Sequence, residues 1–152
     1  MFGRYYEEFT IGDIYKHWPG KTVTESDNNL FSLLTMNHHP VHLDQHYAQA
    51  SVHGKILVVG TYVFSVVVGQ SVRDVSGRAI ANLSYESIKH LGPTFVGDTL
   101  YSQTTVIDKR TSISNANNGV VKVKTTACNQ NEELILAFSR TLLVPLAPTK
   151  KI

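Results

Sequence analysis

A run of about sixteen residues from Val58 to Arg73 limits the possible folds of this chain more than any other feature. Its valines and aromatic residues favour a strand by intrinsic propensity. The run contains no turn signal, however, and it is longer than a typical strand. Small residues also recur along it. Because a helix that is apolar on nearly every side must be buried, the run predicts one central helix wrapped by a sheet.

Four later segments have the composition of strands. Each is 10 to 13 residues long and rich in Val, Ile, Thr and Tyr, and the segments span residues 79–89, 99–108, 120–129 and 133–145. Turn-forming residues such as Gly92-Pro93 separate them. Long antiparallel strands that curl around a central helix make an α+β fold, which is the fold class predicted here.

The first half of the chain mixes short strands and helices. Residues 14–23 read as an extended segment that is interrupted at Pro19-Gly20. Thr24, with Asp27 three residues later, predicts the capping box of a helix. Behind this cap, the predicted helix has an apolar face made by Leu30, Phe31, Leu33 and Leu34. A second short helix is predicted over residues 44–50, with Asp44 near its N-cap.

Composition and charge exclude several classes of protein. A chain of 152 residues with 42% hydrophobic and 17% charged residues is typical of one globular domain. The formal charge of +2 and the lack of a Lys/Arg run argue against nucleic acid as a partner. Cys128 is the single cysteine, so a reducing compartment is the default. The N-terminus lacks the apolar core of a signal peptide, and the apolar run 56–68 is too short to cross a bilayer. We therefore expect a cytoplasmic protein without a membrane partner.

Histidines are concentrated between residues 36 and 48, where four of the chain's seven lie beside Pro40. The unperturbed pKa of imidazole lies near neutrality, so a histidine held at a proline turn is a natural acid or base. Asp44 is the only carboxylate in this segment, and the neutral Asn37 occupies the position three residues before the proline.

The same histidines raise the alternative of a zinc site, formed from His38, His39, His42, His46 and His53. Pro40 interrupts the helical spacing that would align positions 38 and 42 as ligands. No second acidic ligand lies nearby in the sequence. We therefore expect no metal at this segment.

Two motifs point to a known family. The first runs from Asn37 to Asp44 and is followed by Tyr47-Ala48, and the second is Pro-Thr-Phe-Val-Gly-Asp-Thr-Leu at residues 93–100. Because it contains both motifs, the chain resembles the MaoC-like, (R)-specific enoyl-CoA hydratases of the hotdog fold. In that family the first motif is Asp-x-Asn-Pro-(Leu/Ile/Val)-His-x-Asp and the second is Pro-x-Phe-x-Gly-Asp-Thr-Leu. The resemblance covers roughly residues 8–146 and implies one hotdog domain over residues 1–152.

The resemblance implies catalytic roles for three residues. His42 matches the catalytic His and would take a proton from water. Gly60 follows it by eighteen residues, as does the glycine that opens the family's central helix. Its backbone N–H would face the thioester oxygen, where a helix N-terminus favours negative charge. Asn37 replaces the catalytic Asp; it can hold a water by hydrogen bonds but cannot exchange a proton at neutral pH.

Four further residues are candidates for substrate binding. His39 replaces a family Asn that shapes the loop, and Tyr47 is either a substrate wall or part of the core. Lys55 and Lys89 would meet the phosphates of CoA, or are solvated surface lysines. No cofactor is expected.

Three functions remain open at the level of sequence. The first is a hydratase or dehydratase of short enoyl-CoA thioesters, including branched or dicarboxylic ones such as mesaconyl- or itaconyl-CoA. The second is an acyl-CoA thioesterase, which usually needs a carboxylate near the thioester carbonyl. The third is a non-catalytic acyl-thioester-binding protein, suggested by Asn37. A homodimer or a dimer of dimers is expected, because a helix with no charge between Ile56 and Gln70 needs cover on every side.

Overall fold

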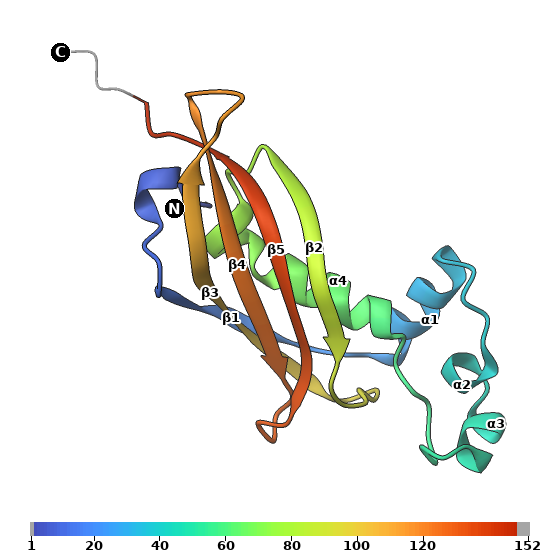
Figure 1. Cartoon of the computed structure of the whole chain (residues 1–152). Helices are drawn as coiled ribbons and strands as arrows, with labels where there is room; N and C mark the ends of the chain where they lie inside the picture. The colour runs from blue at the N-terminus through green and yellow to red at the C-terminus, as the bar shows by residue number, and fades with distance from the viewer. Residues whose placement is uncertain (1, 149–152) are drawn as a thin grey trace.

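A curved sheet with one long helix on its inner face makes up most of the chain (Figure 1). The computed structural model describes residues 2–148. The sheet is antiparallel and five-stranded, with the order β1-β3-β4-β5-β2. Its strands are β1 (Ile14–Thr22), β2 (Ala81–His90), β3 (Thr99–Thr111), β4 (Asn118–Cys128) and β5 (Leu134–Pro145). The α+β fold is confirmed, and the four strands predicted in the second half end within three residues of their predicted bounds.

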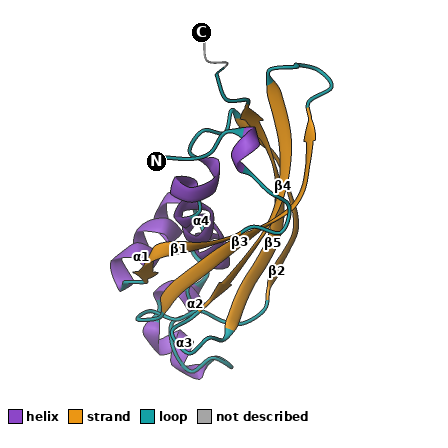
Figure 2. Ribbon diagram, turned by 90° about the vertical axis from the view of Figure 1, so that its left-hand side faces the viewer, coloured by secondary structure: helices purple, strands orange, loops and turns teal. Residues whose placement is uncertain are grey.

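The predicted central helix is α4 (Gly60–Gln70), and the sheet curves around it (Figure 2). A short 3₁₀ turn (Tyr6–Glu8) precedes β1, and a π-helical turn (Val72–Ser76) follows α4. The helices α1 (Glu25–Leu34), α2 (Pro40–Leu43) and α3 (Gln45–Ala50) gather beyond the end at which α4 begins (Figure 1). Within residues 2–148, no helix is both long and apolar enough to cross a membrane.

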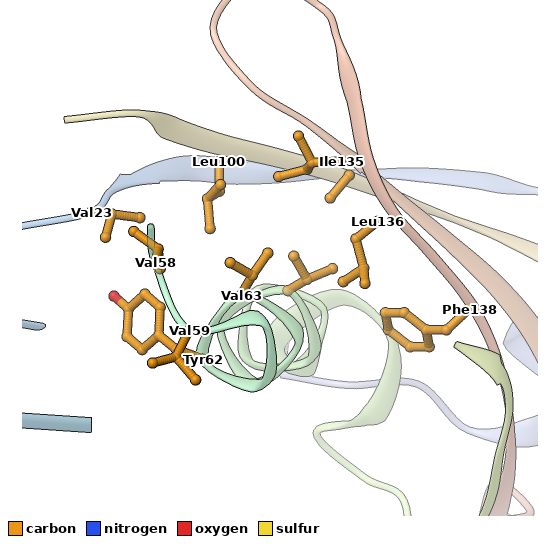
Figure 3. Packing of buried hydrophobic residues seen from close by; sticks show 11 residues of the cluster. Val23, Val58, Val59, Tyr62, Val63, Leu100, Ile135, Leu136 and Phe138 are labelled. Carbon is orange, nitrogen blue, oxygen red and sulfur yellow. The ribbon is translucent and has the colours of Figure 1, made fainter. Parts of the chain in front are cut away.

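The core lies between α4 and the sheet (Figure 3). Val63 and Val67 of α4 are buried, and Leu100 of β3 and Leu136 and Phe138 of β5 belong to the same cluster. Burying one such side chain contributes about 1.5–3 kcal/mol relative to leaving it exposed. This packing fixes the start of α4 against the sheet.

The predicted capping box of α1 is confirmed. The Thr24 hydroxyl accepts from the Asp27 N–H at 3.2 Å, and the Asp27 carboxylate accepts from the Thr24 N–H at 2.9 Å. A hydrogen bond from Lys21, with Nζ 2.7 Å from the Asp27 carboxylate, lowers the pKa of Asp27 to about 2. The cap therefore stays ionised at neutral pH, and α1 keeps its start.

Of the predicted apolar face of α1, Phe31 packs against the core, with its ring centroid 5.5 Å from that of Tyr62, but the leucines do not turn inward. Leu30, Leu33 and Leu34 are 59%, 61% and 73% exposed, whereas the buried residues of α1 are the polar Asn28 and Ser32. The reason is a hydrogen-bonding role for Asn28, which turns this side of α1 toward α2 and the start of α4. The leucines are left as an exposed apolar surface.

Candidate active site at the start of helix α4

Residues 41–42 lie beside residues 57–59, which lead into α4. The Leu57 N–H donates to the Val41 carbonyl at 3.1 Å, and Nδ1 of His42 lies 2.7 Å from the Leu57 carbonyl oxygen. A carbonyl oxygen only accepts, so Nδ1 carries the proton and donates it. In the neutral ring the lone pair is then on Nε2, for which residues 2–148 provide no hydrogen-bond partner. His42 is held as a base with a defined tautomer.

A fully buried amide, Asn28, joins His42 to the start of α4. Its Nδ2 donates to the His42 carbonyl at 2.9 Å, and its Oδ1 accepts from the Val59 N–H at 3.0 Å. Val59 immediately precedes Gly60, so one side chain sets the backbone of the candidate base relative to the helix N-terminus. Asn28 was not among the predicted site residues. Its only sequence signal was an amide inside a helix, where Asn has low propensity.

The N-terminus of α4 presents unpaired backbone donors. Val59 is its N-cap and has no side chain that could cap the helix. Among residues 2–148, none bonds to the N–H of Gly60, and the helix dipole adds partial positive charge there. Anionic oxygen atoms are favoured at such a site.

The space beside Gly60 is occupied by an imidazole. A Cβ built at Gly60 would lie 3.0 Å from Cε1 and 3.2 Å from Nε2 of His90, which ends β2. Contacts this short are tighter than ordinary van der Waals packing. The absence of a side chain at Gly60 thus makes room for His90, which was not among the predicted site residues.

A pocket of about 330 Å³ opens at this point, and Gly60, His53 and His90 are among its lining residues. The segments 57–58 and 91–94 form much of the remaining wall. The lining contains two imidazoles and no carboxylate. Any ligand that reaches the Gly60 N–H through this pocket would meet His90.

The second sequence motif builds the turn beyond this wall. The Asp98 carboxylate accepts from the Phe95 N–H at 2.7 Å, and Gly97 has a φ of +94°, which favours glycine. The Val58 N–H donates to the carbonyl of Thr94 at 2.9 Å, which ties this motif to the entry of α4. Asp98 therefore has a structural role in this turn.

His39 and Tyr47 lie close to His42. The ring centroids of His39 and His42 are 6.0 Å apart, and those of His39 and Tyr47 are 6.1 Å apart, both in edge-on arrangements. Nδ1 of His39 accepts from the Val41 N–H at 3.1 Å and caps α2. The structure thus brings these two predicted residues together with His42 at an exposed surface.

The remaining predicted residues lie differently. Asn37 is partly buried and its N–H donates to Ser32, but within residues 2–148 its side chain makes no hydrogen bond with His42. Lys55 places Nζ 4.1 Å from the Phe95 ring centroid, beside a groove of about 500 Å³ that shares the wall 91–93 with the pocket. Lys89 directly precedes His90, and successive strand residues face opposite sides of a sheet. The structure does not bring Lys89 into the pocket.

Tyr62 is a further titratable group on the first turn of α4. Burial, together with the nearby Asp27 carboxylate, raises the pKa of Tyr62 to about 12. It therefore stays protonated at neutral pH and does not compete with His42 as a base. In the part of the chain that the structure describes, no three His, Cys, Asp or Glu side chains gather as a possible metal site.

Comparisons with known proteins agree on one family. The profile of the MaoC like domain family matches residues 7–129. A mesaconyl-CoA hydratase from Cereibacter sphaeroides is 33% identical over 142 residues, which are 93% of this chain and 41% of that protein. A beta-methylmalyl-CoA dehydratase from Chloroflexus aurantiacus is 30% identical over 142 residues, 93% of this chain and 40% of the relative. The chain thus spans about two-fifths of the length of these curated relatives.

A solved structure carries the same fold. A conserved hypothetical protein from Mycobacterium tuberculosis, described as having a double hotdog fold, superposes with a TM-score of 0.89 at 25% identity. The match covers 99% of this chain and 46% of that one. The sheet wrapped around α4 is therefore a hotdog, as predicted.

Proposed function

Because this chain belongs to the MaoC-like domain family, we propose that it is a hydro-lyase that adds water to the double bond of a short enoyl-CoA thioester. One observation carries the proposal: Nδ1 of His42 is committed to the carbonyl of Leu57, in the segment that leads into the unpaired N–H groups of α4, and Nε2 is left free. Addition of water to an enoyl thioester needs a base that takes a proton from the water, and hydrogen-bond donors that stabilise the negative charge on the thioester oxygen.

The proposed reaction begins with His42. Its Nε2 takes a proton from water as the water oxygen bonds to Cβ of the enoyl group. The π electrons of the double bond shift toward the thioester oxygen, where the Gly60 N–H and the α4 dipole stabilise the enolate charge. Protonation of Cα from the imidazolium completes the addition. Asn37 would hold the water by hydrogen bonds.

The proposed substrate is a short acyl group, branched or dicarboxylic like the mesaconyl group in the name of one relative. A pocket of about 330 Å³ supports this size class. Lys55, beside the adjoining groove, is proposed to meet the phosphates of CoA. We further propose that the protein acts in the cytoplasm.

A coupled assay separates the three functions that remained open from the sequence. Loss of enoyl absorbance from mesaconyl-CoA or crotonyl-CoA without release of free thiol is the expected result. Thiol release would instead identify a thioesterase. The absence of both signals, with the thioester bound, would identify a non-catalytic binding protein and contradict the proposal.

Replacing Asn37 by aspartate should lower the initial rate on both substrates. The new negative charge would hold His42 protonated and repel a substrate carboxylate, an effect of about one to a few kcal/mol at roughly 4–6 Å. Initial rates of the natural protein and of Asn37→Asp on the two thioesters test this, and Asn37→Ala controls for loss of the amide alone. A rise on both substrates would mean that the natural site has lost hydration and only binds thioesters.

We propose that the chain forms a homodimer or a dimer of dimers. The exposed side of α4 carries Thr61, Ser65 and Gly69, small residues four apart that let a second helix approach closely. Sedimentation should show a dimer or larger assembly at micromolar concentration. Ser65→Arg should dissociate it, whereas Ile113→Arg, at a loop residue that is 95% exposed, should not. A monomeric natural protein at that concentration would contradict the assembly.

A further inference from the structure

The contact between His90 and Gly60 is fixed by the sheet. His90 pairs with Leu136 of β5, and the next residue, Leu91, donates its N–H to Ile135 at 2.8 Å. The backbone on both sides of the imidazole is thereby held. The nearest ring atoms lie 3.0–3.3 Å from where a Cβ of Gly60 would be, so the ring borders the space that the thioester must enter.

The pocket is lined by groups that favour negative charge on a ligand, and its lining has no carboxylate. Its ionisable lining residues are His53 and His90, and both are imidazoles that can donate a hydrogen bond or carry positive charge. The N-terminus of α4 adds partial positive charge. The rest of the lining is largely apolar, with Leu57, Val58, Val63, Leu91, Pro93 and Ile135, and suits the alkyl part of an acyl chain. The two imidazoles and the helix N-terminus favour an anionic group on that chain.

We propose that His90 is a specificity-determining residue that binds the free carboxylate of a dicarboxylic acyl-CoA. The inference rests on the proposed function, because it places the thioester oxygen at the Gly60 N–H. The second carboxylate of a short dicarboxylic acyl group then lies within the same small pocket and accepts a hydrogen bond from the His90 ring. Such charge-assisted hydrogen bonds are about twice as strong as neutral ones.

Two saturated thioesters, which cannot be hydrated, allow the binding of the free carboxylate by His90 to be measured apart from catalysis. Succinyl-CoA and butyryl-CoA have acyl chains of equal length and differ by a terminal carboxylate in place of a methyl group. By titration calorimetry, the natural protein should bind succinyl-CoA about tenfold or more tightly than butyryl-CoA, as one hydrogen bond to a charged group predicts. His90→Leu should abolish this preference and leave the affinity for butyryl-CoA within about twofold.

Two further variants serve as controls. His90→Gln, which keeps a donor without the charge, should retain part of the preference. His46→Leu, at an exposed histidine of α3, should retain all of it. Thermal unfolding of each variant checks that the fold is kept.

The outcomes separate this inference from the proposed function. The inference is overturned by a natural protein without preference, by a preference that survives in His90→Leu, or by an equal loss of both ligands in that variant. A protein that prefers succinyl-CoA through His90 but hydrates no enoyl-CoA would refute the proposed activity and leave the carboxylate site standing.

Discussion

Replacing His42 by alanine should lower kcat/KM for enoyl-CoA hydration by roughly 10²- to 10⁴-fold, the range typical of a lost acid–base group. Nδ1 of His42 is held by the Leu57 carbonyl, so Nε2 is the nitrogen available to take a proton from water. No carboxylate lines the adjacent pocket to replace it. Initial rates on crotonyl-CoA and mesaconyl-CoA, together with circular dichroism to verify the fold, measure the effect.

The neighbouring histidines supply the controls for His42. His38→Ala and His46→Ala should retain most of the activity, since both side chains are exposed and neither is bonded to the segment that leads into α4, as His42 is. Similar losses in all three variants would point to a shared metal ion rather than to one base. Metal analysis of the purified protein would then decide between the two explanations.

Replacing Asn28 by leucine should lower both stability and activity. The change leaves the His42 carbonyl and the Val59 N–H without their buried partner, and each unpaired group costs about 1–3 kcal/mol. We therefore expect the free energy of unfolding, measured by urea denaturation, to fall by about 2–6 kcal/mol. Hydration should also slow in the folded fraction, because Asn28 sets the base relative to the start of α4.

Two variants define which part of the amide matters. Asn28→Asp keeps an oxygen that accepts from the Val59 N–H but cannot donate to the His42 carbonyl. This variant therefore tests the contact with the His42 carbonyl alone. Asn117→Leu, at an exposed loop between β3 and β4, controls for the substitution itself and should change neither quantity. An Asn28→Leu protein with natural stability and rate would contradict the role of this residue.

The fold was largely predictable because its main signals are local. The run without charged residues that forms α4 could be stable only inside the protein. The capping box at Thr24 indicated the start of α1. The turn residues that separate the later segments marked the ends of the long strands. Each of these signals lies within a few residues of the element that it predicts.

Other features depend on contacts between distant parts of the chain. Asn28 meets partners 14 and 31 residues away, so periodicity alone could not reveal that α1 turns this amide inward and its leucines outward. The four-residue helix α2 is too short to show a period. The position of His90 beside Gly60 follows from how β2 packs against α4, which no local pattern encodes.

The most direct test of the proposed chemistry is to incubate the protein with mesaconyl-CoA in water labelled with a heavy oxygen isotope and to analyse the products by mass spectrometry. The expected product is an intact thioester that has gained one water with the labelled oxygen in its acyl group, and His42→Ala should yield almost none of it. Unchanged mesaconyl-CoA, or free CoA with a labelled carboxylic acid, would contradict hydration at this site.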